Sequence, residues 1–147
     1  FAIGDLDGDG DDDLVLAQPD RAQLLFFEWR DGTFTMRTIP TLAGITSLAF
    51  GDINGDGKLD LLIASPEEET LAWKSGAVAL DAFPEQIACN DKPSAVAVDP
   101  TGKVFVLART DKRQGHLSLV EPGKAPLQVT DLGRLPAAPS RRTELHA

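Results

Sequence analysis

Two nine-residue stretches carry side chains that could hold a metal ion. The first loop spans residues 5–13 and the second loop spans residues 52–60, and both follow the pattern D-x-[DN]-x-[DN]-G-x-x-D. Calcium is a hard cation that takes roughly six to eight oxygen ligands, which Asp, Asn and backbone carbonyls supply. Alternate spacing at loop positions 1, 3 and 5 turns three side chains toward one centre. The pattern therefore predicts two calcium sites.

Each position of the loop has an expected role. Gly10 and Gly57, at position 6, permit the sharp turn because glycine reaches backbone angles that other residues avoid. Position 7 would offer its backbone carbonyl, which explains why its side chain differs between the copies. Position 9 would close the site. The expected ligands are Asp5, Asp7, Asp9, Asp11 (by its carbonyl) and Asp13 in the first loop, and Asp52, Asn54, Asp56, Lys58 (by its carbonyl) and Asp60 in the second.

Two alternatives bear on this interpretation. An EF-hand begins in the same way, but it needs a glutamate at position 12 and flanking helices. Position 12 is Leu16 or Ile63 here, and both lie in strand-like runs. A solvated turn without metal is the other alternative, which the recurrence of the pattern disfavours. Asp11 and Asp12 are expected to carry solvated charge. With three carboxylates and one amide, the second loop is predicted to bind calcium more weakly.

The two loops belong to a longer repeat. The stretch "FAIGDLDGDGDDDLVLA" begins at residue 1 and "LAFGDINGDGKLDLLIA" at residue 48, so matching aspartates lie 47 residues apart. Each period holds about four short runs rich in Val, Leu, Ile and Phe, bounded by Gly, Pro and Asp. In the third period, the residues 99–102 (DPTG) fit a type I turn in place of an acidic loop. Four antiparallel strands per repeat are typical of a propeller blade.

The repeat predicts an all-β chain, a β-propeller fragment of about three four-stranded blades. Blade 1 (1–47) and blade 2 (48–94) each carry a calcium loop, blade 3 (95–135) is degenerate, and residues 136–147 form a linker and the start of the next blade. The fourth strand of blade 2 is expected at 77–83. Propellers close with about four to eight blades. We therefore expect a segment truncated at both ends, with the remaining blades of the same propeller as its partners.

These motifs resemble a known family. The two loop stretches and the sequence DGTF at 31–34 are similar to the FG-GAP repeat of integrin α-subunit propellers and, more closely, to the bacterial VCBS/FG-GAP-like repeat. The resemblance covers residues 1–75. It implies a propeller, usually of about seven blades, in which each loop binds calcium within a β-hairpin. It also implies that the Asp and Asn side chains at loop positions 1, 3, 5 and 9 are the ligands.

Composition limits the possible functions. The net charge of −9 argues against nucleic acid or an anionic membrane as partner. No apolar run approaches the roughly 18 residues that would predict membrane insertion. The sequence contains no G-x-S-x-G, H-E-x-x-H or phosphate-loop motif, so we expect no enzyme activity.

The expected function is a binding or adhesion scaffold for a protein or carbohydrate ligand, with two structural Ca²⁺ ions. Loops of extracellular modules bind calcium at about 10⁻⁴–10⁻³ M, which favours a secreted, periplasmic or cell-surface location. The alternatives are the non-catalytic part of a secreted polysaccharide-active enzyme and an architectural module of a large surface protein. Among the remaining residues, Trp29 and Trp73 are expected to pack between blades, His116 and His146 to lie on the surface, and Cys89 to be half-buried.

Overall fold

The described part of the chain is all-β, as predicted. The computed structural model describes residues 1–76, 82–87, 89, 91–110, 114–121, 123 and 129–135. Within these residues twelve strands form three four-stranded antiparallel sheets, and the helical content is the single 3₁₀ turn η1 (Pro19–Arg21). None of the described residues forms a helix that is long and apolar enough to cross a membrane. The expected linker at 136–147 lies outside the described residues.

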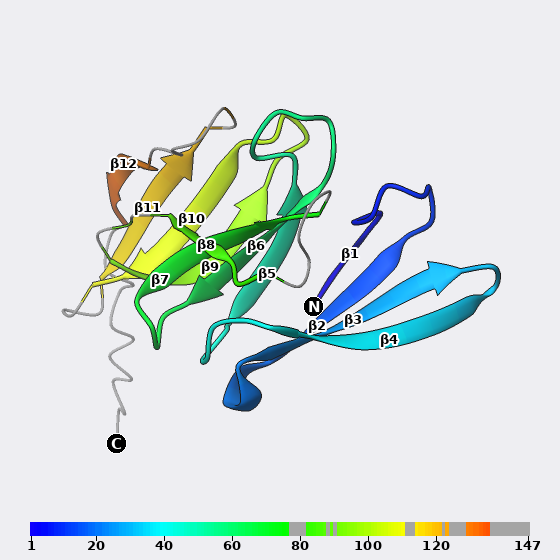
Figure 1. Ribbon diagram of the computed structural model, residues 1–147. Helices are drawn as coiled ribbons and strands as arrows, with labels where there is room; N and C mark the ends of the chain where they lie inside the picture. The colour runs from blue at the N-terminus through cyan, green and yellow to red at the C-terminus, as the bar shows by residue number, and fades with distance from the viewer. Residues whose placement is uncertain are drawn as a thin grey trace, which may run out of the picture.

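Each sheet is a simple meander in chain order (Figure 1). The first sheet contains β1 (Ala2–Gly4), β2 (Asp13–Gln18), β3 (Gln23–Arg30) and β4 (Thr33–Pro40). The second contains β5 (Ser47–Gly51), β6 (Asp60–Ser65), β7 (Thr70–Ser75) and β8 (Glu85–Ile87). The third contains β9 (Lys92–Val98), β10 (Val104–Arg109), β11 (Gly115–Val120) and β12 (Val129–Arg134). The predicted number of strands per repeat is therefore confirmed for all three repeats.

Local turn chemistry explains the long β3–β4 hairpin. Arg30 pairs directly with Thr33, which leaves a two-residue turn. Asp31 and Gly32 have φ values of 52° and 78°. Two positive φ angles in succession are typical of a type I′ turn, which favours Asp-Gly because its twist matches that of the flanking strands.

The fourth strand of the second sheet differs from the prediction. Residues 77–81 lie outside the described residues, and Ala82 and Phe83 are not in a strand. Instead Glu85 pairs with Trp73, and Ile87 pairs with Leu71. Ile87 is 4% exposed within the core. The described edge strand therefore places Ile87 in the second core.

The second sheet packs between the other two, and two hydrophobic cores fill the interfaces. In β6, every residue is buried. Leu61 and Ile63 belong to the first core, with Phe26 of β3, whereas Leu62 belongs to the second core, with Val104 of β10. Because successive strand residues face opposite sides, a continuous apolar run is what a sheet covered on both faces requires. Trp73 also lies in the second core, which confirms its predicted packing between repeats.

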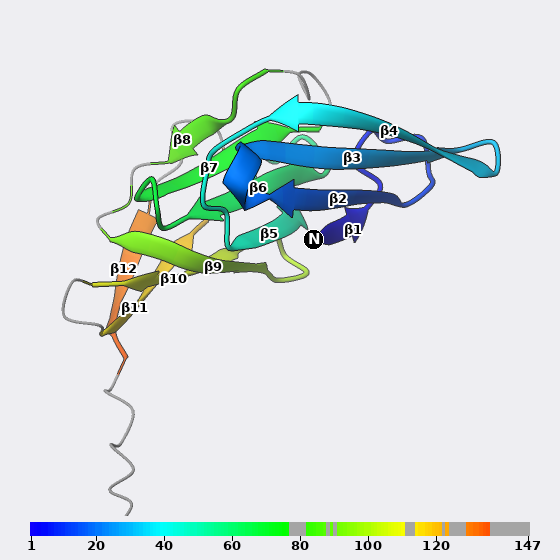
Figure 2. The ribbon, with the colours of Figure 1, turned by 90° about the horizontal axis from the view of Figure 1, so that it is seen from below.

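The first strands of the three sheets approach each other closely at two glycines. β1 contacts β5, and β5 contacts β9 (Figures 1 and 2). A Cβ on Gly4 would lie 2.9 Å from Phe50 Cδ2, and a Cβ on Gly51 would lie 2.5 Å from Val98 Cγ1. These glycines occupy the same repeat position, just before each acidic loop. The close approach sets both loops at the same end of neighbouring sheets.

Candidate metal centre

The two acidic loops connect the first and second strands of their sheets, and one apolar side chain anchors each of them. Leu6 and Ile53, at loop position 2, are 1% and 0% exposed and belong to the first and the second core respectively. These anchors were not predicted from the sequence. An aliphatic residue at position 2 of both loops, between polar loop residues, was the signal that could have indicated them.

The aspartate at position 1 organises the turn through backbone hydrogen bonds. The Gly8 N–H donates to Asp5 Oδ1 (2.7 Å) and the Gly10 N–H donates to Asp5 Oδ2 (3.1 Å). Asp52 accepts the matching two bonds, at 2.8 and 2.9 Å, from the glycines at positions 4 and 6 of the second loop. Gly10 and Gly57 have φ values of 98° and 82°. Both need the left-handed region, as predicted for position 6.

Positions 3 and 5 each accept a bond from the backbone two residues further along. In the first loop the Asp9 N–H donates to Asp7 Oδ1 (3.1 Å) and the Asp11 N–H donates to Asp9 Oδ1 (3.0 Å). In the second loop Asn54 Oδ1 and Asp56 Oδ1 accept the equivalent bonds, both at 2.9 Å. Successive Asx turns therefore curl both loops in the same way. The Oδ2 atoms of Asp7, Asp9 and Asp56 take no part in these turns, and Asn54 has only the one oxygen.

The aspartate at position 9 is buried in both loops. Asp13 Oδ2 accepts the Leu6 N–H (3.1 Å) and Asp13 Oδ1 accepts the Trp29 N–H (3.3 Å). Asp60 is 0% exposed, and its Oδ2 accepts the Ile53 N–H (2.9 Å). Among the described residues, Asp60 Oδ1 is buried without a hydrogen-bond partner. Burial raises the pKa of both carboxyl groups.

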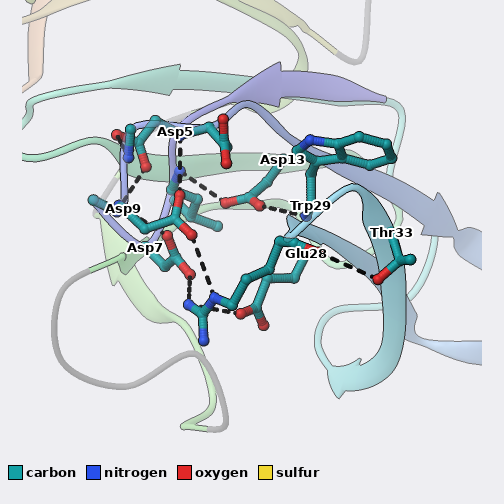
Figure 3. Close-up of polar contacts among 12 residues, drawn as sticks. Asp5, Asp7, Asp9, Asp13, Glu28, Trp29 and Thr33 are labelled. Atoms are coloured by element: carbon teal, nitrogen blue, oxygen red, sulfur yellow. Dashed lines mark hydrogen bonds and ion pairs between the residues drawn. The ribbon is translucent and has the colours of Figure 1, made fainter.

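Three carboxylates of the first loop fit the requirements of a hard cation. One carboxylate oxygen from each of Asp5, Asp7 and Asp13 lies within 4.8 Å of the others (Figure 3). Calcium ligands lie about 2.3–2.6 Å from the ion, so two ligand oxygens are at most about 5 Å apart. The three carboxylates of the second loop do not converge within the same limit. That loop instead offers the unpartnered oxygen of Asp60, which is costly to bury without a partner, at about 1–3 kcal/mol.

A cation from the protein itself lies at the first loop. Arg30 ends β3, and its Nη2 is 3.0 Å from Asp7 Oδ2 and 2.8 Å from Glu28 Oε1. Its Nε is 3.4 Å from Asp9 Oδ2. Glu28 and then the two loop aspartates raise the pKa of Arg30, so its guanidinium carries a fixed positive charge. Neither Arg30 nor Glu28 was predicted from the sequence to be part of this site.

The third sheet has a hydrogen-bonded turn where the others have an acidic loop. The Gly102 N–H donates to the Asp99 carbonyl (3.0 Å), which closes the predicted turn. Asp99 Oδ1 accepts bonds from the Thr101 hydroxyl (2.7 Å), the Thr101 N–H (2.8 Å) and the Lys103 N–H (3.0 Å). The hydroxyl bond contributes most to lowering the pKa of Asp99. Neutral and backbone donors thus satisfy this carboxylate.

His116, which was predicted to lie on the surface, is partly buried and contacts two aspartates that the sequence did not indicate as its partners. Its side chain is 13% exposed, with Nδ1 against Asp91 Oδ2 and Nε2 against Asp131 Oδ1. The bond to Asp91 and then the bond to Asp131 raise the pKa of His116. The two aspartates are 25 and 15 residues away in sequence, so only the sheet brings them together. Cys89 lies beside this cluster and is half-buried, as predicted, whereas His146 is outside the described residues.

Comparison with known proteins identifies the repeat. Residues 5–63 match the family model described as an FG-GAP-like repeat. This range begins at the first aspartate of the first loop and continues into β6, so it includes both acidic loops. No curated protein matches the chain in sequence.

Proposed function

We propose that this chain, an FG-GAP-like repeat protein, is a calcium-stabilised β-propeller segment whose three sheets are successive blades. The meander order of each sheet and the neighbouring first strands support this arrangement. Gly4 and Gly51 support it further, because each permits the close approach of the next sheet at one repeat position. A propeller requires this regular stacking around a common axis.

An apolar outer face on the first sheet supports the stacking of a further blade. Phe26 faces the first core, so the alternation of the strand turns Phe27 and Trp29 to the opposite face. Phe34 of β4 lies 4.6 Å from Trp29 between ring centroids, and it is 55% exposed. We propose that another blade of the same kind covers this face.

The observation that carries the calcium proposal is the buried, unpartnered oxygen of Asp60, in a loop whose hydrogen bonds match those of the first loop. The side chains at positions 1, 3, 5 and 9, with the carbonyls of Asp11 and Lys58, would hold the ion. Calcium, when bound, would balance the negative charge of these carboxylates. Position 1 follows the first strand and position 9 begins the second, so ligands at both positions would hold the two strands in register.

We propose that the segment is a non-enzymatic scaffold for a protein or glycan ligand. A groove of about 540 Å³ opens between the second loop and the β9–β10 turn, and Phe50, Val98 and Thr101 are among its lining residues. It combines apolar surface with polar loop edges, as ligand sites commonly do. The loop carboxylates accept backbone N–H bonds and would hold a cation, so they are poor general bases. A calcium requirement near millimolar concentration suits a secreted, periplasmic or cell-surface location.

Thermal unfolding of the chain in 10 mM calcium and in EGTA tests the calcium proposal, with 10 mM magnesium as the matched control. We expect calcium to raise Tm and magnesium to raise it much less, because magnesium demands a tighter octahedral shell. Equal Tm values in calcium and EGTA would refute the proposal. Glycan-array binding with and without EGTA then tests the scaffold role, since loss of binding in EGTA is expected only if the loops support the ligand surface.

A further inference from the structure

Arg30 places a positive charge at the oxygens that a divalent cation would need in the first loop. Asp7 and Asp9 each use Oδ1 to accept a backbone N–H. Their Oδ2 atoms, which remain for a cation, are the atoms that Arg30 contacts at 3.0 and 3.4 Å. An ion that binds these two oxygens competes with the positively charged guanidinium group for them.

The second repeat carries no charged residue at the sequence position that matches Arg30. The residue 47 positions after Arg30 is Ala77, whose side chain carries no charge. In this loop Asp56 Oδ2 accepts a bond from the neutral amide of Asn54, at 3.1 Å. The two loops therefore share their backbone hydrogen bonds but differ at the Oδ2 atom of position 5, which contacts the Arg30 guanidinium in the first loop and the Asn54 amide in the second.

We infer that Arg30 competes with calcium for Asp7 and Asp9 and so sets the calcium concentration at which the first loop fills. This inference rests on the proposed calcium function. Glu28 gives the displaced guanidinium a second partner, 2.8 Å from Nη2, so Arg30 stays near the loop when calcium enters. The first loop has one carboxylate more than the second, but the positive charge of Arg30 offsets it, so we expect no higher calcium affinity in the first loop.

The competition has a modest size. Arg30 is 56% exposed, and ion pairs in such positions are individually weak because water and salt screen them. Losing two of them on calcium entry should lower the affinity of the first loop by roughly threefold to tenfold. We expect this decrease to offset the higher calcium affinity that the additional carboxylate would otherwise give the first loop over the second.

The test is a calcium titration of the ¹⁵N-labelled chain, followed by NMR at the Gly10 and Gly57 amides, which report on the two loops separately. In the Arg30→Gln variant we expect the first-loop affinity to rise roughly threefold to tenfold, with the second loop unchanged. Arg30→Lys should give an intermediate value, because it keeps the charge but loses the planar fork. Arg109→Gln, at the exposed end of β10, makes the same charge change far from the first loop and should leave the ratio of the two affinities unaltered.

The outcomes separate this inference from the calcium proposal. If calcium shifts neither glycine amide in any variant, both ideas are overturned. If both amides shift but Arg30→Gln leaves the first-loop affinity unchanged or lower, the Arg30 inference alone is wrong. The Arg30 Nε–H resonance is a direct second readout, and it should move with the Gly10 amide during the titration of the unmodified chain. Dispersed amide spectra without calcium establish that each variant is folded.

Discussion

Replacing Asp60 by asparagine should remove the calcium response of the second loop without harming the calcium-free fold. Asp60 is fully buried, and its Oδ2 accepts the Ile53 and Asn54 N–H groups while Oδ1 has no partner among the described residues. An asparagine oxygen can accept the same two bonds in the same volume. The substitution also removes a buried carboxyl group whose pKa is raised by burial. When no cation is present, the neutral asparagine should therefore be at least as compatible with the folded state as the aspartate.

The expected magnitudes follow from these contacts. Without calcium, the free energy of unfolding should stay within about 1 kcal/mol of the parent value or rise, since the lost charge offsets the burial of an amide nitrogen. With 10 mM calcium and a Kd of about 10⁻⁴–10⁻³ M, each occupied loop adds about 1.4–2.7 kcal/mol. For a chain of this size, that corresponds to roughly 3–10 °C in Tm per loop.

Differential scanning calorimetry in EGTA and in 10 mM calcium measures both the stability without calcium and the stability that calcium adds. The Asp12→Asn variant is the matched control, because Asp12 is an exposed residue within the first loop that has no assigned ligand role. We expect Asp60→Asn to lose about half of the calcium-induced rise in Tm and Asp12→Asn to keep almost all of it. A full calcium response in Asp60→Asn, or a loss of several kcal/mol in EGTA, would refute the reasoning about the unpartnered oxygen.

Three further predictions concern the rest of the molecule. Gly51→Ala should cost about 1–3 kcal/mol in urea unfolding because its Cβ would meet Val98, and an unchanged stability would show that the second and third sheets do not pack this tightly. The raised pKa of His116 means that its stabilisation is complete below the unfolded pKa of about 6.5 and is lost as pH rises through the folded pKa. His116→Gln should flatten that pH dependence of Tm, and an unaltered profile would contradict the role of the two aspartates. Asp99→Asn should lower Tm equally in calcium and in EGTA, since backbone and hydroxyl donors satisfy Asp99, and a loss seen only in calcium would contradict a metal-free turn.

Local chemistry explains why the sequence predicted the repeat and the shape of its loops. The acidic pattern, its glycines and its return at 47 residues are contained in short stretches. The hydrogen bonds of Asp5 and Asp52 reach at most five residues along the chain. The short apolar runs and the turn residues between them are equally local, so the four antiparallel strands of each repeat were also predicted from the sequence. Whether calcium occupies the loops remains a prediction.

Contacts set by the pairing of distant strands could not be predicted in this way. Arg30 is 21 residues from Asp9, and it reaches the loop only because β3 runs back alongside β2. His116 meets its two aspartates through the register of the third sheet. The pairing of β8 with β7 places Ile87 in the second core. Each of these features requires knowing which strands are neighbours, and the local pattern does not contain that information.

Isothermal titration calorimetry of the chain with calcium tests most directly whether both loops are metal sites. We predict two bound ions with Kd values of about 10⁻⁴–10⁻³ M, and the loss of one of them in the Asp60→Asn variant. Binding that remains at two ions in that variant, or no binding at 10 mM calcium, would contradict the assignment of these loops as calcium sites.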